Sequence, residues 1–114
     1  MAALTATRPT NLGTVTAGAA VAASDTVDQS LLGSRGAFLR INNGNAASDN
    51  VTISDFGATG AGNQLTSNQV TDTITTAQAQ IYLLQPQQVN PATGLITITH
   101  SVTSTVTYEL YPLL

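Results

Sequence analysis

The stretch GAFLRINNGNAASDNVTISD, residues 36–55, decides the fold class of this chain. Its first part alternates, because Leu39 and Ile41 fall on one side of an extended backbone while Phe38 and Arg40 fall on the other. A two-residue period of this kind predicts a half-buried β-strand rather than a helix.

A second strand is expected at residues 51–54, where Val51 and Ile53 repeat the alternation. Asn-Gly at 43–44 is a strong turn signal, because both residue types tolerate positive φ. The linking segment, residues 43–50, is longer than a tight two-residue loop. Two arrangements stay open: a hairpin with a long loop, or two strands that lie in different sheets.

Short β-type segments recur along the rest of the chain at roughly ten-residue spacing. We expect them at residues 13–24, 25–30, 70–76, 77–84, 95–100 and 105–111. The segment 77–84 also fits a helix, but its short length and the following Gln85-Pro86 favour a strand. The last two segments form the clearest pair, with residues 101–104 as a hairpin link.

Six to eight such strands predict an all-β fold, an antiparallel β-sandwich of the jelly-roll or Ig-like type. A small barrel is the alternative. Residues 13–114 form this single domain, and residues 1–12 precede it as an extended N-terminal arm with little apolar periodicity. Ordering a backbone costs roughly 1–2 kcal/mol per residue, so we expect the arm to become ordered on a partner. A frayed terminus explains the same pattern.

Charged residues make up only 8% of the chain, against roughly 25% in an average soluble domain. The net charge is −3, and the only basic residues besides His100 are Arg8, Arg35 and Arg40. A phosphate backbone requires clustered basic side chains, so nucleic acid is not an expected partner. No apolar run approaches the roughly 18 residues that span a bilayer, so no membrane contact is expected.

The sequence offers few groups for catalysis, and we expect no enzyme. Cysteine is absent, and no Gly-x-Ser-x-Gly motif occurs. His100 stands at the end of a strand beside a turn, where a surface position is expected. The carboxylates are scattered without a spacing that brings two together.

A cluster of oxygen-bearing side chains in one loop offers ligands of the kind that calcium prefers. Its members are Asn43, Asn45, Asp49 and Asn50. Their spacing does not match a helix-loop-helix calcium loop, and turn formation by Asn and Asp explains the cluster without metal. No metal or cofactor is therefore expected.

The layout resembles small β-rich head proteins of tailed bacteriophages, the capsid decoration or cement proteins. The resemblance rests on GAFLRINNG at 36–44, VTI at 51–53, a Pro-containing polar loop, and the strand pair LITIT at 95–99 and VTYEL at 106–110. It spans most of the chain from residue 36 onward and includes no catalytic or ligand motif.

This resemblance implies a structural virion protein on the capsid exterior. Its partner would be the major capsid protein, and it would form a homo-oligomer, with a trimer favoured. For the capsid contact we expect the arm, through Leu4, Arg8, Pro9 and Leu12. A tail or head-tail connector protein and a host- or glycan-binding β-sandwich module are the alternatives.

Overall fold

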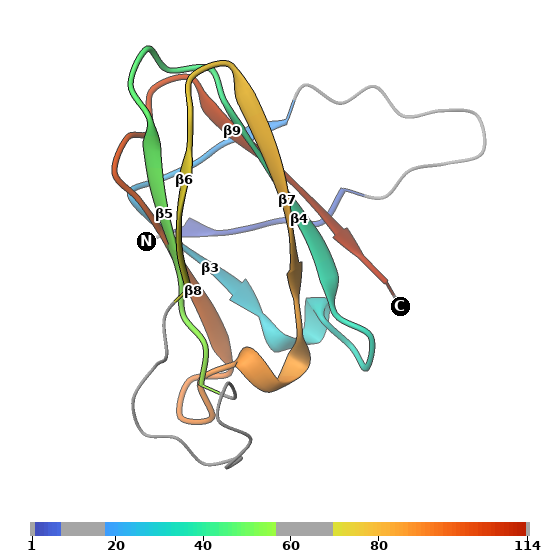
Figure 1. Cartoon of the computed structure of the whole chain (residues 1–114). Coiled ribbons are helices and arrows are strands. Elements are labelled where there is room, and N and C mark those ends of the chain that lie inside the picture. Colours follow the sequence, from blue (N-terminus) through green and yellow to red (C-terminus); the bar gives the residue numbers. More distant parts are fainter. Residues whose placement is uncertain (1, 8–17, 57–69, 114) are drawn as a thin grey trace, which may run out of the picture.

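The computed structural model describes residues 2–7, 18–56 and 70–113, and they form two β-sheets packed face to face (Figure 1). This confirms the predicted all-β sandwich. The five-stranded sheet has the order β1 (Ala2–Ala3), β3 (Ser24–Asp28), β8 (Leu95–His100), β5 (Asp49–Ile53), β6 (Val70–Ile74). The four-stranded sheet has the order β2 (Ala19–Ala20), β9 (Val106–Pro112), β4 (Ala37–Asn43), β7 (Gln78–Leu84). Two 3₁₀ turns complete the described elements, η1 (Gln29–Leu31) and η2 (Pro86–Gln88).

Strands β2 to β9 pair in a nested way. β2 pairs with β9, β3 with β8, β4 with β7 and β5 with β6, all antiparallel. Pairs nested in this way correspond to one long hairpin that is folded over on itself. The folding places β9 next to β4 and β8 next to β5, and each of these pairs is also hydrogen-bonded. Two four-stranded sheets joined in this way form a jelly roll, with β1 added at the edge of one sheet.

Strands that are close in sequence mostly lie in opposite sheets. β4 and β5 do so, which decides the question that the sequence left open. The predicted hairpin of β8 and β9 is wrong, because these strands also lie in different sheets and residues 101–105 cross between them. Alternation shows which side of a strand is buried, and it does not show which neighbour completes the sheet.

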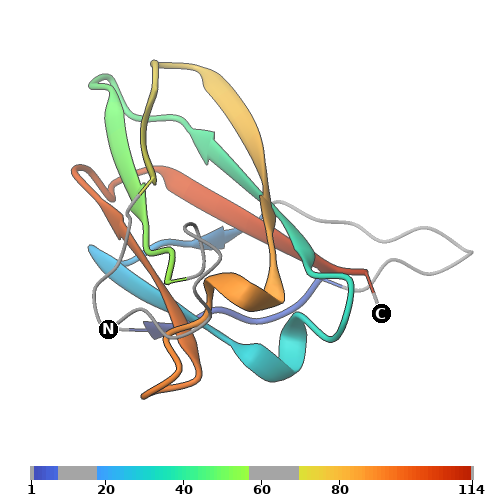
Figure 2. The same cartoon turned by 60° about the horizontal axis from the view of Figure 1, so that its bottom comes forward.

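The crossing links meet at one end of the sandwich and hold one another by hydrogen bonds. Gly44 N donates to Thr105 O at 3.0 Å, Asn45 Nδ2 to Ser104 O at 2.9 Å, and Thr76 Oγ1 to Ala46 O at 2.9 Å. Figure 2 shows the 3₁₀ turns at the opposite end. There Gly36 has a φ of +89°, and an added Cβ would lie 2.2 Å from Leu84 O, so only glycine fits.

The core lies between the sheets and is built from the inward positions of both. Its fully buried members include Val27, Leu39, Ile41, Ile74, Ile96, Ile98 and Leu110. The alternation predicted from sequence therefore gave the correct inward residues on β4 and β5, where Leu39, Ile41, Val51 and Ile53 are buried.

The N-terminal residues that the structure describes lie along one edge of the sandwich and contact both sheets. β1 runs parallel to β3, Leu4 N donates to Thr26 O at 2.8 Å, and Thr7 N donates to Leu110 O at 2.6 Å. Leu4 is 6% exposed and belongs to the core. This stretch therefore closes an edge of the fold.

Candidate interaction face

One outer surface of the sandwich carries an apolar patch. The exposed large apolar side chains among the described residues are Phe38, Ile81 and Leu83, with 41%, 64% and 46% of their surfaces accessible. All three point outward from β4 and β7, the strands at one side of the four-stranded sheet. We define the β4/β7 face by these residues together with Arg40, Glu109 and Tyr111.

Strand register places these six residues in two rows across the sheet. One row is Leu83, Phe38 and Tyr111. The other row is Ile81, Arg40 and Glu109. Adjacent strands are about 4.8 Å apart and alternate residues about 7 Å apart, so the six side chains form one continuous patch.

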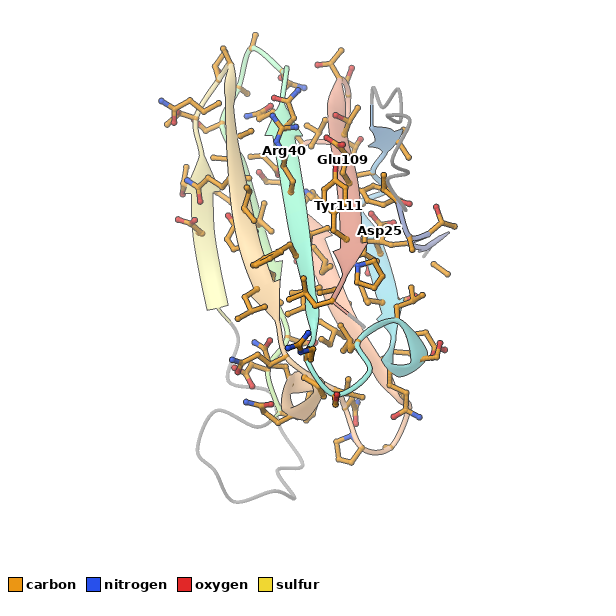
Figure 3. All side chains as sticks on the ribbon, turned by 90° about the vertical axis from the view of Figure 1, so that its right-hand side faces the viewer. Asp25, Arg40, Glu109 and Tyr111 are labelled. Atoms are coloured by element: carbon orange, nitrogen blue, oxygen red, sulfur yellow. The ribbon has the colours of Figure 1, made fainter. Side chains whose placement is uncertain are left out.

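A polar cluster lies inside this patch. Arg40 Nη1 donates to Glu109 Oε1 at 3.0 Å, and the Tyr111 hydroxyl donates to Glu109 Oε2. Figure 3 shows the three side chains together on the outer side of β4 and β9. The hydrogen bond to Glu109, followed by burial, raises the pKa of Tyr111. The two opposite charges cancel, so the face presents aromatic and apolar surface with no net charge.

Tyr82 lies on β7, the end strand of the four-stranded sheet, and it faces the other sheet because its register partner is the inward Leu39. Its hydroxyl donates to Asp72 Oδ2 at 2.9 Å, and Asp72 lies on β6 of the other sheet. Burial, and next the hydrogen bond to Asp72, raises the pKa of Tyr82 above its ordinary value. Tyr82 thus links β7 and β6, which are end strands of the two sheets.

The expectation of a surface position for His100 is wrong. Its side chain is 1% exposed, and its Nδ1 lies 2.6 Å from Oδ2 of the fully buried Asp49. The other oxygen of Asp49 accepts a hydrogen bond from Ser101 N at 3.0 Å. The hydroxyl of Ser101 accepts a hydrogen bond at 2.8 Å from the backbone N of Asn50, the residue next to Asp49 on β5. This buried contact holds β5 against the end of β8.

The polar groups weighed as calcium ligands are used within the fold. Asn43 is fully buried, its Nδ2 donates to Ala47 O and Ile74 O, and its Oδ1 accepts from Asn45 N. In the part of the chain that the structure describes, no group of three or more His, Cys, Asp or Glu side chains could hold a metal ion. Nor does any helix there have the length and apolar character needed to cross a membrane.

The residues expected to contact a capsid have different positions. Leu4 lies in the core, so a contact through it would require the edge stretch to leave the sandwich. Arg8, Pro9 and Leu12 lie outside the described residues. The sequence reasoning did not identify the β4/β7 face. The available signal was Phe38, a large aromatic residue on the otherwise polar side of its strand, and Ile81 and Leu83 join it only through register.

Comparison with known proteins gives no relative. No protein-family model matches the chain, no curated protein matches it, and no solved structure matches it. The function must therefore be argued from the chemistry of the chain itself, in which the β4/β7 face is the feature that packing within the described fold does not explain.

Proposed function

We propose that this chain is a structural virion protein that docks onto the outer surface of a tailed-phage capsid through its β4/β7 face and stabilises the lattice. The observation that carries the proposal is the gathering of Phe38, Ile81 and Leu83 on one outer face. Scattered apolar residues are normal on a protein surface, whereas a contiguous patch marks an interaction site.

The composition of the face supports a protein partner. Aromatic residues and arginine are enriched at the centres of protein–protein interfaces, and Phe38, Arg40 and Tyr111 are neighbours here. Arg40 is already paired with Glu109, so covering the face leaves no charge without a partner. The capsid as the specific partner comes from the resemblance of the strand pattern to decoration proteins.

The mechanism of stabilisation is mass action. A ligand that binds only the assembled lattice adds RT ln(1 + [L]/Kd) per site, about 2.7 kcal/mol when free ligand exceeds Kd a hundredfold. Repeated over many sites, this contribution opposes lattice opening. The chain suits such docking because its surface is poor in long charged side chains, which lose the most rotamer entropy when covered.

The test is binding to purified heads, followed by imaging of the decorated particle by cryo-EM. We expect density on the capsid exterior in many symmetric copies, with the β4/β7 face toward the shell. The variant Phe38→Ser should lose head binding, while Thr99→Ser on the opposite outer face should keep it. Arg8→Ala and Leu12→Ala test the expected arm contact without removing the core residue Leu4.

Other outcomes would reject the proposal. Density confined to the tail or neck would assign the protein to the tail or head-tail connector class. No particle association, together with specific signals on a glycan array, would favour a host-binding module. Equal binding by Phe38→Ser and the native chain would show that the face is not the contact.

A further inference from the structure

We propose that the edge of β7 pairs with the same edge of a second copy, giving a two-fold dimer with one continuous eight-stranded sheet. This inference is independent of the capsid proposal. It starts from the place of β7 at the end of the four-stranded sheet, next to β4 only. The seven residues of β7, QAQIYLL, include no charged residue and no proline.

The directions of the β7 backbone groups follow from the register. Leu113 N donates to Gly36 O at 3.0 Å, in line with the β4–β9 pairing. Gly36, an even-numbered residue, is therefore bonded toward β9. Hydrogen-bonded pairs alternate in an antiparallel ladder, so the other even-numbered residues of β4 also bond β9, and the odd-numbered residues bond β7. Since the odd positions of β4 face the even positions of β7, the even-numbered residues of β7 point their backbone groups toward β4.

The odd-numbered residues of β7 therefore point their N–H and C=O groups away from the sheet. These residues are Ala79, Ile81 and Leu83, and none of their backbone groups bonds another described residue on that side. Natural proteins protect long edges with charges, prolines or bulges, because exposed backbone groups template pairing with another strand. β7 has none of these devices.

The other described edges differ from β7. We therefore expect β7 to pair with β7 of a second copy rather than with a different edge strand of that copy. β1 and β2 have two residues each, and β6 carries Asp72 in its centre. Among the edges that the structure describes, β7 alone is long and without charge. A strand paired with itself by a two-fold axis closes the assembly, whereas a head-to-tail contact would extend into a filament.

Hydrogen-bonding parity requires outward residues of one copy to face outward residues of the other. Of the registers that meet this condition, we choose the one that pairs all three outward residues of each copy. In it the axis passes through Ile81, and Ala79 of one copy faces Leu83 of the other. A small side chain then meets a large one on the outer face, and Ile81 meets Ile81. Each of these three residues donates and accepts one hydrogen bond, and the two β4/β7 faces become continuous.

Sedimentation and light scattering of the full chain test the oligomeric state. We expect twice the 11.7 kDa monomer mass for the native chain. Ile81→Pro should be monomeric and folded by circular dichroism, because its N–H is not needed in the monomer's own ladder. The control Ile81→Val, which keeps the N–H, should remain a dimer. A native monomer at high micromolar concentration would overturn the proposal, as would a trimer that Ile81→Pro leaves intact.

A cysteine cross-link tests the register even if the proline variant does not fold. The native chain has no cysteine, so Ile81→Cys introduces a single thiol. In the dimer its Cα would lie about 5.5 Å from its counterpart, within disulfide range, and oxidation should give a covalent dimer. Phe38→Cys is the control, because three strand spacings of about 4.8 Å separate its two copies. Equal cross-linking of both variants, or none at Ile81→Cys, would contradict the register.

Discussion

The outer faces of the two sheets differ in chemistry although both belong to one sandwich. The five-stranded sheet presents short hydroxyl side chains, with Ser24, Thr99 and Thr52 in one row across it. The four-stranded sheet presents Leu83, Phe38 and Tyr111 in a comparable row. Both inner faces are mainly apolar, so folding explains the inner surfaces of both sheets and the outer surface of only one.

The outer face of the four-stranded sheet is therefore the surface with a candidate role in binding. Threonine on an outward strand position has high β propensity and remains compatible with water, so the five-stranded sheet needs no further explanation. Outward Phe38, Ile81 and Leu83 expose apolar surface that gains nothing from the monomer fold. Substitutions at matched positions on the two faces test this contrast.

The largest expected effect comes from adding a charge to each face. Phe38→Asp combined with Leu83→Asp should weaken head binding at least about a hundredfold, because two carboxylates would be covered without partners. The matched pair Thr97→Asp and Thr99→Asp on the other face should change the affinity less than about threefold. Quantitative co-sedimentation with heads measures both, and similar losses for the two pairs would remove the distinction between the faces.

A smaller effect, on the free energy of unfolding, is expected when the shared acceptor Glu109 is removed from the polar cluster of the β4/β7 face. Glu109→Ala leaves Arg40 and the Tyr111 hydroxyl without their acceptor, and we expect a loss of about 1–2 kcal/mol. The expected loss of stability is smaller than for a fully buried ion pair, because the Arg40 side chain is 39% exposed and solvent screens its charge.

On the threonine-rich face, Asn50→Ala is the comparison. It removes an exposed hydrogen bond from Thr73 Oγ1, and about 0.5 kcal/mol should be lost. Urea unfolding measures both variants. A loss for Glu109→Ala no greater than that for Asn50→Ala would mean that the cluster does not stabilise the fold.

Alkaline pH should act through Tyr82 and Tyr111, which both lie on the four-stranded sheet. The pKa values of Tyr82 and Tyr111 are raised in the folded state, so their contribution is complete below the unfolded value of about 10. It is lost as the pH rises from there toward the folded values. Tyrosinate absorbance and urea unfolding across this range should show late ionisation and falling stability, and Tyr82→Phe should reduce the fall. Ionisation of both Tyr82 and Tyr111 near 10 would contradict this.

Salt should have the smallest effect. The charges of the β4/β7 face form an internal pair, and few others exist on the chain. Raising ionic strength from low to moderate values should therefore change head affinity less than about threefold. A steep loss of affinity with salt would indicate a contact through other, charged residues.

Sequence reasoning reached the fold class and the inward residues but missed the pairing of the last two strands and the face. Leu39 and Ile41 were placed inward because alternation is a local signal. His100 was expected outside because its partner Asp49 lies 51 residues away and has no recognisable spacing to it. Phe38 was placed outward correctly, and no local pattern could join it to Leu83 and Tyr111.

Composition and alternation identify this chain as a charge-poor, threonine-rich β domain and indicate which side of its strands faces inward. Those properties follow from composition and from the two-residue period of an extended backbone. Only the tertiary structure decided that consecutive strands cross between sheets, that His100 is buried with Asp49, and that Arg40 meets Glu109 across 69 residues. The physical reason is that strand neighbours are selected by closure of the whole core, a long-range condition that no short stretch of the chain contains.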